Sequence, residues 1–99
     1  MSAVIPPRCG SVRDSVCRDM AEQLLAGGGQ LVDVRSPVDF GRDALPGALN
    51  LPVDALAWEF RRLNRCSPVI LCGASEFRSK RAACLLAGEG FSRIYYLGG

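Results

Sequence analysis

The sequence predicts an α/β domain with a mostly parallel sheet and helices on both of its faces. Short apolar, β-branched runs alternate with helix-forming stretches along the 99 residues, and this alternation is typical of parallel sheets. A hydrophobic fraction of 48% allows a core in one domain of this length. We expect an N-terminal arm over residues 1–10, where Pro6-Pro7 opposes helix, and the domain over residues 11–99.

The expected elements follow one another in a regular order. They are an amphipathic helix from Ser15 to Leu25 ended by Gly27-Gly28-Gly29, a strand at Gln30–Arg35, a helical turn at Val38–Arg42, a short strand at Ala48–Leu51, a helix at Asp54–Leu63, a strand at Val69–Leu71, a helix that ends at Gly88, and a strand at Ile94–Leu97. In parallel sheets, ligands bind beyond the carboxyl ends of the strands. Cys72 and Asp33-Val34-Arg35 should therefore share one edge of the sheet.

The stretch Leu71–Ala83 carries the main chemical signal. Cys72 falls where a strand ends, and Arg78-Ser79 fall where a helix begins. A tight loop between them would turn its backbone N–H groups inward, beside the positive end of the helix dipole. Together with the Arg78 guanidinium, these groups would form a cup for a tetrahedral oxyanion, with a sulfur at its base. Such a field favours thiolate over thiol, so we expect a depressed pKa for Cys72.

Composition excludes several classes of function. A net charge of +2 is too small to argue for nucleic acid or a membrane surface, and no apolar run reaches membrane-spanning length. Histidine is absent and the five cysteines form no C-x2-C pair, so Cys-His or Ser-His catalysis, a metal site and a cofactor are not expected. Residues 1–10 lack a secretory pattern, so we expect a cytoplasmic protein with reduced thiols.

Several short motifs, in order, resemble the rhodanese family. The matching residues are Leu31-Val32-Asp33-Val34-Arg35, Asp39-Phe40, Leu45–Pro52, Cys72, Arg78-Ser79, Ala82-Ala83, Leu86, Gly90-Phe91 and Leu97-Gly98-Gly99. The resemblance covers about residues 12–99. It implies a sulfurtransferase in which the Cys72 thiolate attacks the outer sulfur of a donor such as thiosulfate. The resulting Cys72 persulfide would then pass its sulfur to cyanide or to a thiol, possibly of a protein.

The resemblance also implies roles for individual residues. Cys72 and Arg78 would be catalytic, with Arg78 and the loop N–H groups holding the donor's sulfonate and the sulfite leaving group. The residues implied in substrate binding are Gly73, Ala74, Ser75, Glu76, Phe77 and Ser79. Asp33 and Arg35 would brace the loop rather than react, and a surface ion pair at a strand end accounts for them as well as direct contact with the substrate does.

The loop itself departs from the family pattern. The family usually has Cys-x4-Arg, whereas Cys72-x5-Arg78 has one residue more. A seven-residue loop is similar to those of the cell-cycle dual-specificity phosphatases and related arsenate reductases, which direct the same thiolate at phosphorus or arsenic. A phosphatase normally needs a general acid, for which Asp39, Asp43 and Glu76 are the candidates. Glu76 would repel a dianion if it pointed inward, and a sulfur-relay or interaction domain is a third possibility.

Two further departures concern other parts of the chain. Asp43-Ala44 stands where the family has Gly-His, and the sequence stops at Gly98-Gly99, where the family usually continues with a final helix. Either that helix has been lost or the sequence is a fragment. Without the helix, apolar surface would be exposed, so we expect self-association or coverage of that face by residues 1–10.

Overall fold

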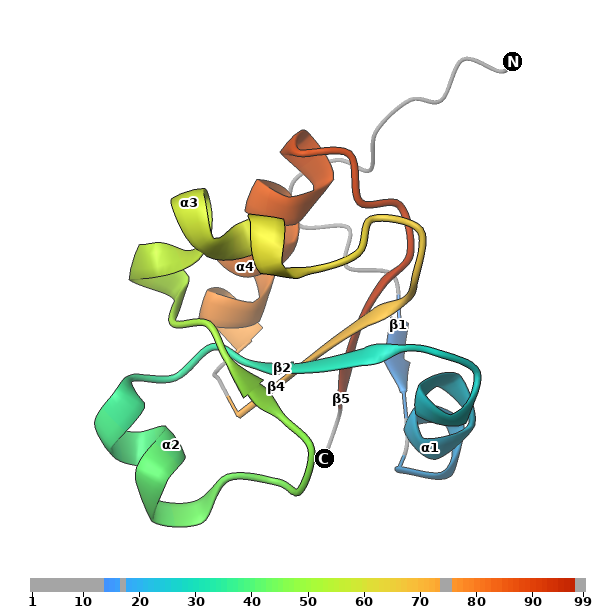
Figure 1. Cartoon of the computed structure of the whole chain (residues 1–99), viewed down its shortest axis with the longest axis horizontal. Coiled ribbons are helices and arrows are strands. Elements are labelled where there is room, and N and C mark those ends of the chain that lie inside the picture. Colours follow the sequence, from blue (N-terminus) through green and yellow to red (C-terminus); the bar gives the residue numbers. More distant parts are fainter. Residues whose placement is uncertain (1–13, 17, 74–75, 98–99) are drawn as a thin grey trace.

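The computed structural model describes residues 14–16, 18–73 and 76–97 (Figure 1). The expected arm at residues 1–10, Cys17 and two of the expected substrate-binding residues, Ala74 and Ser75, lie outside this range. The side chain of Glu76 is also outside what is described.

A five-stranded sheet forms the centre of the domain, with the strand order β1-β5-β4-β2-β3. The strands are β1 (Asp14–Val16), β2 (Gln30–Asp33), β3 (Leu49–Asn50), β4 (Val69–Cys72) and β5 (Ile94–Leu97). Each of the four neighbouring pairs is parallel. The predicted α/β fold with a parallel sheet is therefore confirmed.

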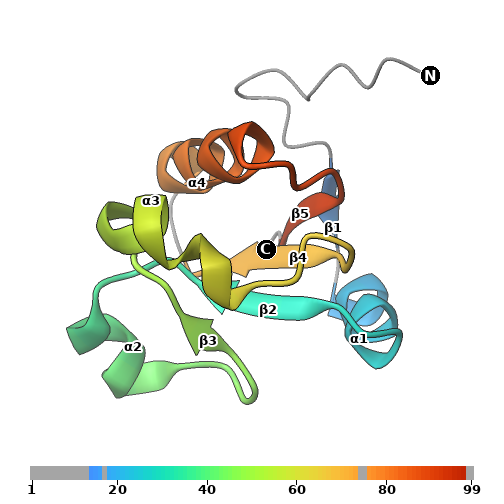
Figure 2. The same ribbon diagram turned by 45° about the horizontal axis from the view of Figure 1, so that its top comes forward.

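Helices cover both faces of this sheet. They are α1 (Arg18–Ala26), α2 (Pro37–Asp43), α3 (Leu56–Glu59) and α4 (Glu76–Gly88), and short 3-10 turns at Val53–Ala55 and Phe60–Arg62 flank α3. Figures 1 and 2 show α3 and α4 together on one face and α1 on the opposite face. None of the helices in the described ranges is long and apolar enough to cross a membrane.

The structure corrects the expected N-terminal helix. Residues Asp14–Val16 form β1, which pairs with β5 in the register Asp14↔Tyr95 to Val16↔Leu97, and the helix begins only at Arg18. The helical spacing of apolar residues could not reveal this strand, because its hydrogen-bonding partner, β5, lies at the far end of the sequence. The expected helix at Asp54–Leu63 is also divided, with α3 between two 3-10 turns.

Two apolar clusters lie on the two faces of the sheet. Val69 and Leu71 of β4 belong to the larger cluster, which is formed with α3 and α4, whereas Ile70 and Cys72 belong to the cluster beneath α1. All four residues of β4 are buried. Because successive side chains of a strand point to opposite faces, Cys72 lies on the same side as Ile70, among apolar neighbours.

Candidate active site

The carboxyl ends of β2 and β4 bring Asp33 and Cys72 together. The two residues are register partners in neighbouring parallel strands, and the backbone N–H of Val34 donates to the carbonyl of Cys72 at 3.4 Å. Both side chains are buried, with exposed fractions of 1% for Asp33 and 3% for Cys72. The expectation that these strand ends share one edge of the sheet is therefore confirmed.

Arg35 holds the buried Asp33 carboxylate in a fixed position. Asp33 Oδ1 accepts hydrogen bonds from the backbone N of Arg35 at 2.9 Å and from its Nε at 3.1 Å, and Oδ2 accepts from Nη2 at 2.9 Å. Arg35 Nη1 donates to Asp43 Oδ1 at 2.9 Å. The hydrogen bonds to Asp33, followed by those to Asp43, hold the pKa of Arg35 above its ordinary value. With Asp33 inside the protein, this is not a surface ion pair.

Asn50 supports the same group, although the sequence analysis did not identify it. Its Nδ2 donates to the carbonyl oxygens of both Asp33 and Arg35 at 3.0 Å. Asn50 is the register partner of Asp33 in β3, which explains how it reaches both carbonyls. Asparagine is disfavoured in strands, so its presence in the apolar run Ala48–Leu51 was the signal in the sequence that could have pointed to a specific role.

Two of the three general-acid candidates already have cationic partners. Asp43 accepts from Arg35, and Asp39 lies 3.8 Å from Arg42. Glu76 is the first residue of α4, and the description does not extend to its side chain. In the described part of the chain, no group of three His, Cys, Asp or Glu residues is arranged to hold a metal ion.

Gly73 connects the ion pair to the start of the loop. Its φ is +82°, a left-handed backbone conformation that residues other than glycine rarely adopt. A Cβ placed on Gly73 would lie 2.7 Å from Asp33 Oδ1 and 2.8 Å from Arg35 Nε. The first loop residue therefore rests directly on the Asp33–Arg35 pair, as expected if that pair braces the loop.

The pKa of Cys72 differs from the expectation. Burial raises the pKa of this thiol to about 11, the Asp33 carboxylate adds to the rise, and Arg35 opposes it. The predicted depressed pKa is therefore wrong for this state of the protein. A thiolate would be poorly solvated among the apolar residues beneath α1, and it would be repelled by the carboxylate of its register partner.

Two further cysteines lie within the described part of the chain. Cys66 carries an exposed free thiol in the connection that precedes β4. Cys84, in α4, is disulfide-bonded, so the expectation of reduced thiols is wrong at this position.

The first turn of α4 separates the other expected site residues. Phe77 is 70% exposed, Arg78 is also exposed, and Ser79 is buried. Phe77 and Arg78 line a surface cavity, whereas Ser79 does not. Arg78 thus faces the cavity, whereas Ser79 lies on the buried side of α4.

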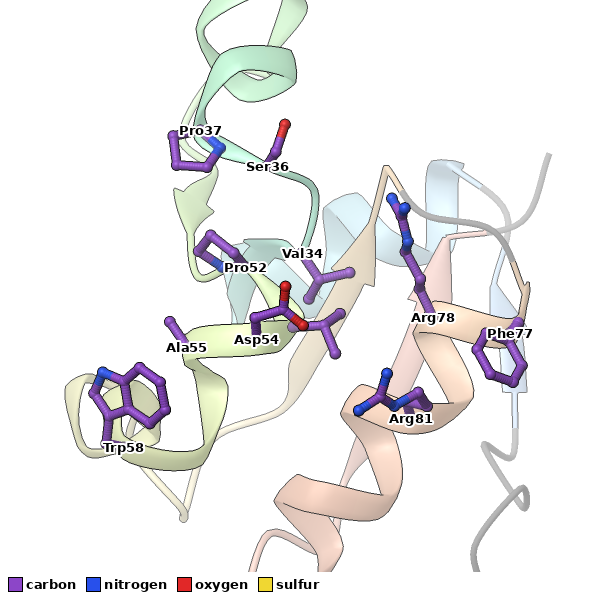
Figure 3. Close-up of a pocket in the computed structure, with 11 residues that line it drawn as sticks. Val34, Ser36, Pro37, Pro52, Asp54, Ala55, Trp58, Phe77, Arg78 and Arg81 are labelled. Carbon is purple, nitrogen blue, oxygen red and sulfur yellow. The ribbon is translucent and has the colours of Figure 1, made fainter.

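This cavity has a volume of about 490 Å³ and lies between α4 and the segments that surround α3 (Figure 3). Its lining residues are Val34, Ser36, Pro37, Pro52, Val53, Asp54, Ala55, Trp58, Phe77, Arg78 and Arg81. The volume falls within the range of small-molecule sites in proteins. Figure 3 shows Arg78 extending toward the carboxyl-end edge of the sheet and Arg81 turning toward the wall that carries Asp54.

Comparisons with known proteins agree with this architecture. A family profile described as "Rhodanese-like domain" matches residues 18–99. Thiosulfate sulfurtransferase GlpE of Pseudomonas syringae is 31% identical over 81 residues, which cover 82% of this chain and 76% of that protein. The uncharacterized protein YqhL of Bacillus subtilis is 37% identical over 70 residues, 71% of this chain, and the match spans only 56% of its length.

A solved structure shows the same fold. The single-domain sulfurtransferase RDL2 of Saccharomyces cerevisiae superposes with a TM-score of 0.70 at 22% identity, over 87% of this chain and 83% of that one. At this identity the likeness concerns the fold alone.

Proposed function

The chain belongs to the rhodanese-like domain family, and on that premise we propose that it transfers sulfane sulfur through a persulfide on Cys72. The Cys72 thiolate attacks the outer sulfur of a donor such as thiosulfate. A bond forms between Cys72 Sγ and that sulfur, the donor's S–S bond breaks, and sulfite leaves with the electron pair. A thiolate or cyanide then attacks the outer sulfur of the persulfide, and Cys72 is released as thiolate.

The position of Cys72 carries this proposal. Cys72 is the last residue of β4, and Arg78 lies in the first turn of α4, three residues into the helix. In our proposal, Arg78 stabilises the negative charge of the donor and of the departing sulfite, as a preorganised cation does in oxyanion sites. The Asp33–Arg35 pair positions the loop through Gly73 and takes no part in the chemistry.

The raised pKa of Cys72 determines how the reaction depends on pH. A rise from 9.0 to about 11 leaves about 100-fold less thiolate at neutral pH than an unperturbed thiol would have. Because the thiolate is the nucleophile, formation of the persulfide should accelerate as the pH rises toward this pKa.

Intact mass after incubation with thiosulfate tests the proposal. We expect the gain of one sulfur atom, its loss in Cys72→Ser, and its retention in the matched variant Cys66→Ser. A chain that gains no sulfur, or that gains it on Cys66, would contradict the assignment.

The length of the loop favours a second candidate function, which is hydrolysis of a phosphate ester or reduction of arsenate by the same Cys72-x5-Arg78 loop. The ion pairs of Asp39 and Asp43 count against the hydrolysis, because a general acid should be available to the leaving alcohol. A third candidate is a relay that receives its sulfur only from a partner protein. Such a chain would accept sulfur from a protein persulfide and not from thiosulfate.

A further inference from the structure

Two opposite charges face the cavity beside the loop without neutralising each other. Asp54 comes from the turn before α3, and Arg81 comes from the second turn of α4 (Figure 3). Both side chains are exposed, and neither forms a hydrogen bond or an ion pair with any residue in the described ranges. The cavity therefore offers an anionic group on one wall and a cationic group on the other.

The surface between these charges is mainly apolar. The buried residues Val34 and Val53 line it, and Pro37, the first residue of α2, and Pro52, in the loop after β3, contribute to one wall. Trp58 stands on the rim with 66% of its surface exposed. A molecule that suits this lining carries a positive and a negative group joined by a short, less polar body.

The cavity adjoins the candidate active site through two of its lining residues, although Cys72 itself is not among the residues that line it. Arg78 lines it, and so does Val34, which donates its backbone N–H to the carbonyl of Cys72. A molecule held between Asp54 and Arg81 would thus lie beside the first turn of α4, which carries Arg78.

From this arrangement we propose that the cavity binds a small zwitterionic thiol, either cysteine or a short cysteine-containing peptide, as the sulfur acceptor. The ammonium group pairs with Asp54, the carboxylate pairs with Arg81, and the thiol lies toward Arg78. The acceptor thiolate attacks the outer sulfur of the Cys72 persulfide. A new S–S bond forms, the bond from that sulfur to Cys72 Sγ breaks, and Cys72 keeps the electron pair. This inference rests on the proposed function and names its acceptor.

The single tryptophan of the chain allows binding to be measured without any chemistry. Because Trp58 lies on the rim, its fluorescence should change when the cavity fills. We would titrate the protein with S-methylcysteine, which carries both charges but no thiol. Two related thioethers serve as comparisons, S-methyl-3-mercaptopropionate without the ammonium and S-methylcysteamine without the carboxylate. The zwitterion should bind at least about fivefold more tightly than either.

Charge-removing variants locate the two contacts. Asp54→Asn and Arg81→Gln should each weaken binding of S-methylcysteine by about fivefold to tenfold, whereas Asp54→Asn should leave binding of S-methyl-3-mercaptopropionate unchanged. Glu22→Gln and Arg18→Gln are the matched controls, because they remove the same charges from exposed positions of α1 on the opposite face. They should not alter binding. Equal affinity for the three compounds, or equal effects of control and cavity variants, would overturn the inference.

A transfer assay separates failure of this inference from failure of the proposed function. Wild-type protein that has been converted to the Cys72 persulfide by thiosulfate should pass its sulfur to cyanide. Among thiols, it should prefer cysteine over 3-mercaptopropionate and cysteamine as the acceptor. If cyanide accepts sulfur but the three thiols react equally well, the function holds and the acceptor assignment is wrong. If no persulfide forms at all, the proposed function is wrong, and the titration alone decides what the cavity binds.

Discussion

Replacing Gly73 by alanine should show whether the Asp33–Arg35 pair fixes the loop, and Gly47 provides the control. Both glycines have φ of +82°. A Cβ on Gly47 would meet nothing within 4 Å, whereas on Gly73 it would lie 2.7 Å from Asp33 Oδ1 and 2.8 Å from Arg35 Nε. The two substitutions therefore share the cost of a left-handed alanine and differ in the collision with the ion pair.

The expected magnitudes follow from that difference. A left-handed conformation costs an ordinary residue about 1–2 kcal/mol, partly offset by about 0.4–1 kcal/mol from a less flexible unfolded chain. Gly47→Ala should therefore lose about 1 kcal/mol. Gly73→Ala must also displace hydrogen bonds of a buried carboxylate, which adds about 1–3 kcal/mol. It should also reduce sulfur loading from thiosulfate, since the loop begins at this residue.

Urea unfolding of the three proteins, with circular dichroism to confirm the native fold, measures the free energies of unfolding. Thiosulfate loading is followed by mass in parallel. If both alanine variants lose the same stability and load sulfur equally well, then the ion pair does not brace the loop.

The remaining predictions concern the nucleophile, the cation, the loop length and assembly. The alkylation rate of Cys72 should rise about tenfold per pH unit up to its pKa of about 11; faster labelling of Cys72 than of exposed Cys66 at neutral pH would contradict the raised pKa. Arg78→Ala should remove about 2–4 kcal/mol of transition-state stabilisation with an unchanged circular dichroism spectrum, and Arg78→Lys should recover only part of it; nearly full activity of Arg78→Ala would show that another group holds the anion. Deleting Glu76 should raise kcat/KM for thiosulfate relative to aryl phosphate, whereas Glu76→Gln should raise both modestly; an unchanged ratio after the deletion would mean that loop length does not select the chemistry. The sheet face beneath α1 carries half-buried apolar side chains, so we expect self-association, which purely monomeric sedimentation at high protein concentration would exclude.

The sequence was sufficient for the elements whose signals are local. The apolar run at Val69–Leu71 and the helix formers before Gly88 located β4 and α4, and with them the position of Cys72 at a strand end. β1 was not predictable, because its three residues become a strand only by pairing with β5, about 80 residues later in the sequence. The bonds from Asn50 to two carbonyls of β2 likewise depend on the register between β2 and β3.

The error about the Cys72 pKa comes first from the burial of the thiol and second from the Asp33 carboxylate, and this second cause again depends on strand register. Side chains two positions apart in a strand point to the same face of the sheet. The sequence alone therefore places Asp33 on the face of Leu31, and Cys72 on the face of Ile70. Only the register, which pairs Leu31 with Ile70 and Asp33 with Cys72, brings the carboxylate next to the thiol. The sequence indicated the groups that would stabilise a thiolate, the helix N-terminus and Arg78, but it did not show that the Asp33 carboxylate lies beside the thiol.

Asp33 therefore has two opposing effects on the candidate active site. Its carboxylate fixes Arg35 and, in our proposal, thereby positions the start of the loop, while the burial of the site and the charge of Asp33 keep Cys72 protonated at neutral pH. Substituting Asp33 changes both effects at once, because a lower pKa of Cys72 would come with a released Arg35. Gly73→Ala disturbs the bracing and leaves the carboxylate charge in place. A loss of sulfur loading in Gly73→Ala with the pH dependence of Cys72 alkylation preserved would assign that loss to the position of the loop, and not to the protonation of the thiol.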